Sequence, residues 1–138
     1  MSESQGFAEE GIPQGFLAVG PHTYRSPTGV AHVTRDDSAP AGTLLLNVTG
    51  EFDRDTLPCL RDALGDVDGE QRECVLLDLS GVTFGDSSFL NELLETHRRA
   101  ARLVVVGPFT GQIRRLFELT GADRVLEIAE DRDSVGIT

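Results

Sequence analysis

The sequence predicts an α/β fold: a single domain with a mixed, mostly parallel sheet of four to five strands and helices packed on it. Residues 75–79 have the sequence VLLDL, a nearly unbroken apolar run that is typical of a strand covered on both faces. From this run onward, strand-like and helix-like segments alternate. Such alternation leads to parallel neighbouring strands joined by right-handed crossovers. A length of 138 residues suits one domain with a core of modest size.

The N-terminal part is expected to add an antiparallel hairpin to this sheet. Residues 30–33 and 44–48 have the composition of strands, and a polar loop with Pro and Gly separates them. Residues 1–28 are rich in Gly, Pro and acidic residues, so we expect an N-terminal arm there and the domain over 29–138. The short apolar island at 16–19 leaves two interpretations open, a flexible arm or a segment laid along the domain or a partner.

A first helix is expected after residue 55, with Asp55 or Thr56 as its cap and Pro58 in its first turn. Its apolar stripe would consist of Leu57, Leu60, Ala63, Leu64 and Val67. A charged linker then leads into a strand over 74–79.

A second helix is expected from Ser88 to about Ala101, followed by a strand over 103–106. A third begins after Thr110 and ends at Gly121, which is a favourable residue for terminating a helix. The predicted inward face of the third helix comprises Ile113, Leu116, Phe117 and Leu119. A short last strand is expected over 125–128.

Charge and composition exclude several classes of partner. The net charge is −11, whereas binding to nucleic acid or to an anionic membrane surface requires a basic surface. No run approaches the length of a membrane span, and the N-terminus lacks the basic start and apolar core of a signal peptide. We therefore expect a cytoplasmic protein with no nucleic-acid partner and no membrane insertion.

The sequence offers no convincing catalytic site, so we expect no enzyme activity and no cofactor. Ser88 lies outside the G-x-S-x-G pattern, and the glycine-containing turn at 107–111 lacks the Lys of a phosphate-binding loop. Asp78 and Asp86 could form a pair of carboxylates, but a strand carboxylate near a loop is more often solvated or bonded to backbone.

Cysteines and histidines give no indication of a metal site. Cys59 and Cys74 are expected to be thiols. His22, His32 and His97 are scattered without the spacing of shared ligands, and His97 falls in line with the apolar face of the second helix, which favours a partly buried structural role.

Asp86, Ser87 and Ser88 lie where the buried strand gives way to the second helix. The first turn of a helix has unpaired N–H groups and the positive end of the helix dipole, so it favours an Asp or Ser cap and can also hold a phosphoryl group. The residues alone thus leave two interpretations, a simple cap or a site of modification.

Several segments, taken together, resemble the STAS domain found in anti-sigma factor antagonists and sulphate transporters. GEFD at 50–53 is similar to that family's ending of an early strand. LDLSGVTF at 77–84 with DSS at 86–88 resembles its central strand and switch loop, and GP at 107–108 with IRRLFELTG at 113–121 resembles its last helix and turn. The resemblance extends over about residues 30–133.

The resemblance implies a function in bacterial stress-response transcription. Antagonists of this type bind an anti-sigma factor that is also a serine kinase and so release a sigma factor. The kinase phosphorylates a serine of the switch loop, and a PP2C-type phosphatase removes the phosphate. By position the modified residue would be Ser88, with Ser87 as the alternative. The other function that the resemblance allows is a non-phosphorylated STAS module for ligand binding, a transport complex or a scaffold.

Two residues depart from the family's pattern, which usually has Gly after the two serines and an apolar residue before the Asp. This chain has Phe89 and Gly85 at those positions. Phe89 could pack on the edge of the protein's own core, anchor a partner, or block phosphorylation.

The expected docking face follows the start of the second helix. Its expected partner-binding residues are Asp86, Ser87, Ser88, Phe89, Asn91, Glu92 and Glu95. The alternative for Glu92 and Glu95 is a solvated helix surface, on which Glu95 would pair with Arg98 or Arg99.

Overall fold

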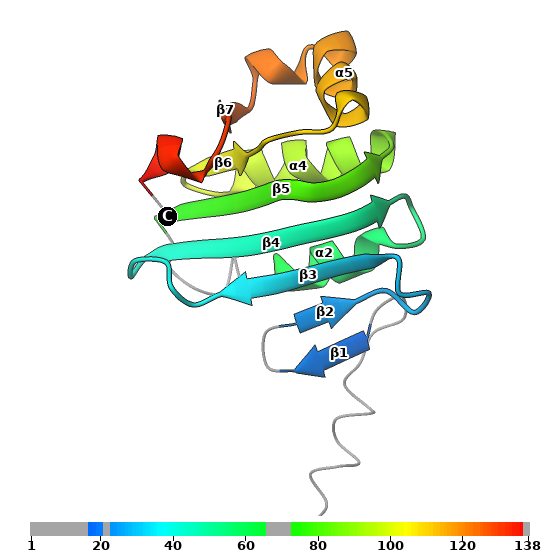
Figure 1. Ribbon diagram of the computed structural model, residues 1–138. Helices are drawn as coiled ribbons and strands as arrows, with labels where there is room; N and C mark the ends of the chain where they lie inside the picture. Colours follow the sequence, from blue (N-terminus) through cyan, green and yellow to red (C-terminus); the bar gives the residue numbers. More distant parts are fainter. Residues whose placement is uncertain (1–16, 21–22, 66–72, 137–138) are drawn as a thin grey trace, which may run out of the picture.

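The computed structural model describes residues 17–20, 23–65 and 73–136, and in these ranges seven strands form one sheet (Figure 1). The strands lie side by side in chain order. They are β1 (Leu17–Gly20), β2 (Thr23–Arg25), β3 (Ala31–Asp36), β4 (Thr43–Phe52), β5 (Cys74–Gly85), β6 (Leu103–Val106) and β7 (Glu127–Ala129). The predicted α/β class with a mixed sheet is confirmed, with more strands than the four to five expected.

The sheet has an antiparallel half and a parallel half. Strands β1 to β4 pair antiparallel, and the predicted hairpin is confirmed as β3 and β4. Strands β4 to β7 pair parallel. The two additional strands, β1 and β2, come from the segment that precedes residue 29. They are only four and three residues long, too short for periodicity to reveal them.

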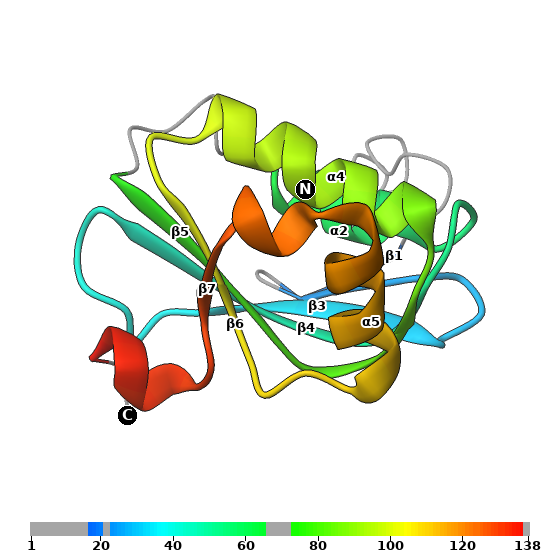
Figure 2. The ribbon, with the colours of Figure 1, turned by 90° about the horizontal axis from the view of Figure 1, so that it is seen from above.

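Three helices connect the parallel strands: α2 (Leu57–Ala63), α4 (Ser87–Arg99) and α5 (Gly111–Thr120). They cover one face of the sheet (Figure 2). The main core lies between them and the sheet, and its largest fully buried side chains include Phe52, Leu60, Leu77, Phe89 and Phe117. Among the described residues, no helix is long and apolar enough to cross a membrane.

The other face of the sheet carries a smaller apolar cluster. It consists of Leu45, Leu76, Val104, Val106 and Ala129, with Val135 of the short helix η2 (Arg132–Val135) packed against it. Arg132 fastens η2 to the sheet, since its Nε donates to Asp78 Oδ2 at 2.6 Å and its Nη2 bonds the side chain of Asn47. Asp78 Oδ1 also accepts from the N–H of Ser80 at 2.9 Å, so Asp78 is bonded to backbone, as expected, and to Arg132, and does not form a carboxylate pair with Asp86.

Some element boundaries and faces differ from the predictions. Strand β5 continues to Gly85 instead of ending at residue 79, because a parallel partner, β4, pairs with it along that length. Leu119 is 73% exposed, so its predicted inward orientation is wrong. Thr110 and Gly121 cap α5 as predicted.

The start of α2 differs in one detail. Thr56 occupies the N-cap position, but its side chain makes no capping bond. Its hydroxyl instead donates to the carbonyl of Glu51 at 2.9 Å and accepts from the N–H of Asp53 at 3.0 Å. It thereby closes the turn between β4 and α2. Val67, the last residue of the expected stripe, lies outside the described residues.

Candidate functional site

The site is built where β5 ends and α4 begins. Asp86 is the N-cap residue of α4, and its Oδ1 accepts from the N–H groups of Ser88 at 2.9 Å and Phe89 at 3.1 Å. A carboxylate at this position satisfies two free donors and lies at the positive end of the helix dipole. The N–H of Asp86 in turn donates to the carbonyl of Phe52 at 3.1 Å, which ties the junction to the end of β4. The cap therefore belongs to Asp86 and leaves the serine side chains to other roles.

Ser88 opens onto a shallow hollow of about 280 Å³ that it shares with Asp53, Arg54, Asp55 and Asp86. The two sequence motifs, 50–53 and 86–88, meet here because β4 and β5 are parallel neighbours and their C-terminal ends reach the same edge of the sheet. Asp53 holds the adjoining loop by accepting from the N–H groups of Asp55 at 2.9 Å and Thr56 at 3.0 Å. The hollow thus presents three carboxylates and one guanidinium around a serine.

Five of the seven expected partner-binding residues reach the surface. Ser87 and Asn91 are exposed, while Asp86, Ser88 and Glu95 are half-buried. Glu95 forms the predicted pair with Arg98, whose Nη2 donates to Glu95 Oε2 at 2.9 Å. The pair lies on the exposed side of α4, so this side of the helix is polar.

Glu92 does not belong to that surface. It is 6% exposed, and its Oε1 accepts from Arg61 Nε of α2 at 2.9 Å. Glu92 lies on the side of α4 that faces α2, so its carboxylate serves a contact between two helices. The expectation that Glu92 binds a partner is corrected.

Phe89 points into the core. It is fully buried, and its ring stacks on that of Phe52 with centroids 5.2 Å apart. A Cβ atom at residue 85 would lie 2.4 Å from Phe89 Cδ2 and 3.0 Å from Ile113 Cδ1, so glycine at 85 provides the space for this ring. The interpretation of Phe89 as a core residue is confirmed, and a partner anchor at Phe89 is corrected, because the ring has no exposed surface.

Sequence reasoning missed Gln112, which fixes the backbone just before the cap. Its side chain bonds both backbone groups of Gly85: Oε1 accepts from the N–H at 3.0 Å, and Nε2 donates to the carbonyl at 2.7 Å. This places α5 against the β5–α4 junction. An isolated Gln in the first turn of a helix carries no signal for a contact 27 residues away.

The cysteines and the histidine of α4 lie apart from this site. Burial raises the pKa of the Cys59 thiol to about 11, and both Cys59 and Cys74 are free thiols. His97 is half-buried on α4, as predicted, and its Nδ1 has no hydrogen-bond partner in the described part of the chain. His22 lies outside the described residues. No group of three or more His, Cys, Asp or Glu able to hold a metal ion occurs among the residues that the structure describes.

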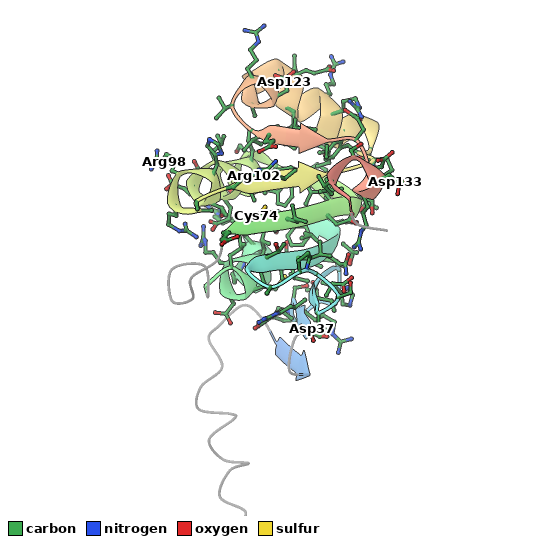
Figure 3. The ribbon with its side chains drawn as sticks, turned by 90° about the vertical axis from the view of Figure 1, so that its left-hand side faces the viewer. Asp37, Cys74, Arg98, Arg102, Asp123 and Asp133 are labelled. Carbon is green, nitrogen blue, oxygen red and sulfur yellow. The ribbon has the colours of Figure 1, made fainter. Side chains whose placement is uncertain are left out.

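Figure 3 shows the opposite edge of the sheet, where Cys74 and Arg102 lie near the starts of β5 and β6. A larger hollow of about 790 Å³ lies there, lined by both residues. Arg102 Nη2 donates to Glu127 Oε2 at 2.5 Å across one side of it. None of the residues of the β5–α4 junction lines this hollow.

Comparison with known families identifies the chain. The family model described as "Mlab, STAS domain" matches residues 35–128, well over half of the chain. The chain belongs to the STAS domain family. No curated protein matches the sequence.

Three solved structures show the same fold as this STAS domain. One is the crystal structure of an anti-sigma factor antagonist from Mycobacterium paratuberculosis, with 27% identity and a TM-score of 0.67, covering 80% of this chain and 95% of that one. The anti-sigma factor antagonist SpoIIAA in its unphosphorylated form has 17% identity and a TM-score of 0.62, with coverage of 75% and 92%. The Bacillus cell fate determinant SpoIIAA in its phosphorylated form has 15% identity and a TM-score of 0.58, with coverage of 75% and 96%. The predicted STAS resemblance is thereby confirmed.

Proposed function

We propose that this STAS domain is an anti-sigma factor antagonist that binds a kinase-type anti-sigma factor and is inactivated by phosphorylation of Ser88. The likeness to the mycobacterial antagonist, which extends over 95% of that chain, supports the general role. The observation that carries the proposal for Ser88 is local. Asp86 caps α4 and Phe89 turns inward, so Ser88 opens onto the surface hollow with its side chain neither engaged in the cap nor covered by the ring.

The hollow supplies a physical reason for phosphate to act as a switch. A phosphoserine carries about −1.5 to −2 charges at pH 7. The N–H groups of Ser88 and Phe89, which would otherwise receive it, already donate to Asp86. The added charge therefore meets the carboxylates of Asp53, Asp55 and Asp86, with Arg54 as the one cation lining the hollow. A partner whose charges complement the unmodified surface would therefore bind the phosphorylated protein more weakly. The core beneath the hollow would not change.

The site of modification is tested directly with the kinase. An extract of the source cells is fractionated for ATP-dependent labelling of the purified protein, and the kinase so found is purified as a recombinant protein. Mass spectrometry should place the phosphate on Ser88. Ser88→Ala should abolish labelling, and the adjacent control Ser87→Ala should leave it intact. A phosphate found only on Ser87, Thr83 or Thr110 would contradict the proposal.

Binding is tested with the same kinase by calorimetry. Ser88→Ala should bind as tightly as the wild type and resist inactivation by ATP. Ser88→Asp should bind more weakly, although Asp carries less charge than phosphate. We expect a PP2C-type phosphatase to restore binding of the phosphorylated protein.

Membership of the STAS domain family also allows a second candidate, a non-phosphorylated STAS module for ligand binding, a transport complex or a scaffold. Affinity capture from the source cells distinguishes the two candidates. Recovery of a kinase that labels Ser88 supports the antagonist. Recovery of a membrane transport ATPase, with Ser88 unlabelled, supports the second candidate.

A further inference from the structure

Two exposed apolar side chains lie in one cross-strand row at the end of the sheet that carries Ser88. Val30 and Phe84 are each 41% exposed. Glu51 pairs with Phe84 in the β4–β5 ladder, and the N–H of Glu51 donates to the carbonyl of Val30 at 2.9 Å. Val30, Glu51 and Phe84 are therefore cross-strand neighbours. They lie near the C-terminal end of β5, and α4 begins at that end of the sheet (Figure 1). We call these three residues the Phe84 row.

An irregularity in β5 turns Phe84 away from the helices. Gly50 pairs with Val82, but Glu51 pairs with Phe84, so Thr83 is an extra residue in β5. Val82 is fully buried under the helices, and strict alternation would point residue 84 to that same side. The extra residue reverses the alternation, as a β-bulge does. Phe84 consequently faces the side of the sheet away from the three helices.

Backbone packing at this edge holds the Phe84 row in a fixed arrangement. Gly50 has φ +102°, and a Cβ there would lie 1.9 Å from the carbonyl oxygen of Val30, so only glycine allows the backbone of residue 50 to approach Val30 in this way. Thr83 Oγ1 also bonds the carbonyl of Gly50 at 3.3 Å. Because the backbone under Phe84 is already held, covering the row costs little further backbone ordering. Buried aromatic anchors are typical of binding hot spots.

The charges around the Phe84 row indicate what kind of partner fits. Glu51 lies within the row, and Asp53, Asp55 and Asp86 lie at the same edge with Arg54 as the accompanying cation. Arg25 lies two residues further back along the sheet, since it pairs with His32 and His32 pairs with Thr49. The edge is thus net acidic, like the whole chain with its charge of −11. A second copy would bring the same carboxylates against themselves, whereas a partner with an apolar pocket rimmed by Arg or Lys matches both features.

We propose that the Phe84 row is part of the docking surface for the kinase-type anti-sigma factor, with Phe84 as the aromatic anchor inserted into an apolar, basic-rimmed pocket. This inference rests on the proposed function and extends it. The partner would contact Ser88 at the end of the sheet and also the Phe84 row, which faces the side of the sheet without the three helices. A partner anchor was one of three interpretations of Phe89, and this proposal assigns that role to Phe84.

The test uses the full chain and the purified kinase that labels Ser88. Phe84→Thr keeps a strand-forming residue, Val30→Thr keeps the shape of valine, and Leu119→Ala removes an apolar side chain that is 73% exposed on α5 and serves as the matched control. Phe84→Thr should weaken binding by roughly thirtyfold or more, the range of an interface hot spot. Val30→Thr should weaken binding severalfold, and Leu119→Ala should leave it unchanged. Glu51→Gln should reduce the dependence of affinity on salt.

The outcomes separate the two levels of the proposal. If Phe84→Thr and Val30→Thr bind as tightly as Leu119→Ala while Ser88 is still phosphorylated, the docking surface is wrong and the antagonist function stands. If the wild type neither binds a kinase nor is phosphorylated, both are wrong. If sedimentation shows a dimer that Phe84→Thr dissociates, the row joins two copies of this chain, and the proposed partner is wrong. Circular dichroism checks that each variant is folded. If Phe84→Thr does not fold, the affinity of Val30→Thr for the kinase tests the docking surface instead.

Discussion

The ring of Phe89 occupies the space that a side chain at residue 85 would fill. With glycine at 85, Phe89 stacks on Phe52 inside the core, whereas a Cβ at 85 would lie 2.4 Å from the ring. The two departures from the usual STAS pattern, Gly85 and Phe89, thus compensate each other. One removes a side chain from the strand end, and the other fills the same space from the first turn of the helix.

This relationship predicts strong coupling between the two positions. Gly85→Ala should lower the free energy of unfolding by about 1–3 kcal/mol, the usual cost of overpacking a core. In a Phe89→Gly background the same substitution should cost much less, because the ring at 2.4 Å is gone and only the flexible end of Ile113, with Cδ1 at 3.0 Å, remains close. Urea unfolding of the four proteins gives the coupling energy. Gly111→Ala is the matched control, since a Cβ there meets no atom within 4 Å. Equal effects of Gly85→Ala in both backgrounds would contradict the compensation.

Phe89→Gly alone should act on stability and not on binding. Removing a fully buried phenylalanine side chain should lower the free energy of unfolding by about 3–5 kcal/mol. Affinity for the kinase, measured at a temperature at which the variant is folded and expressed per folded molecule, should stay within a few-fold of the wild type. A large loss of affinity with little loss of stability would contradict this prediction and show that Phe89 contacts the partner.

Asp86 and Ser88 should separate the helix cap from the modified residue. Asp86→Ala removes the acceptor for two N–H groups and should lower the free energy of unfolding by about 0.5–2 kcal/mol. Ser88→Ala should lower it by much less, since the Ser88 side chain takes no part in the cap, and Asp86→Asn should retain most of the stability. Thermal melts of these variants check the order. A Ser88→Ala protein that is less stable than Asp86→Ala would show that the serine supports the helix start.

Gln112 should matter to the junction although it lies on another helix. Gln112→Ala leaves the N–H and carbonyl of Gly85 without these partners, which should cost about 1–3 kcal/mol of stability. Because Gly85 directly precedes the cap, phosphorylation of Ser88 should also slow. Arg115→Ala, an exposed change on the same helix, is the control. Unaltered labelling kinetics together with unaltered stability would show that the contact does not hold the junction.

Stability should fall at acidic pH through identifiable carboxylates. Hydrogen bonds from Arg102 hold the pKa of Glu127 below its usual value, and hydrogen bonds from Ser38 do the same for Asp36. A carboxyl group whose pKa is lowered in the folded state stabilises the protein above its unfolded pKa, near about 4, and this stabilisation is lost as the pH falls through the folded pKa. Arg102→Gln should therefore flatten the fall in stability below about pH 5. Urea unfolding at several acidic pH values measures the free energy of unfolding of both proteins. If it falls with pH equally in wild type and Arg102→Gln, the Arg102–Glu127 pair does not contribute to the acid sensitivity.

Local sequence sufficed for the elements whose formation depends on short-range chemistry. The apolar run at 75–79 predicted a buried strand, Thr110 and Gly121 marked the two ends of α5, and the DSS junction marked the start of α4. The order of strands and helices also determined the parallel half of the sheet, because alternation allows few other connections. The STAS motifs could be recognised for the same reason, since each lies within one strand, turn or helix.

Contacts between distant segments decided the rest of the site. Phe89 is buried because Phe52 and Gly85 surround its ring, and Glu92 is withdrawn from solvent because Arg61 of α2 lies beside it. Helical periodicity shows which residues share a face, but the face that solvent reaches depends on which helix packs alongside. Phe84 became exposed through one extra residue in the pairing of β4 and β5, a register that two strands set together and neither sequence specifies alone.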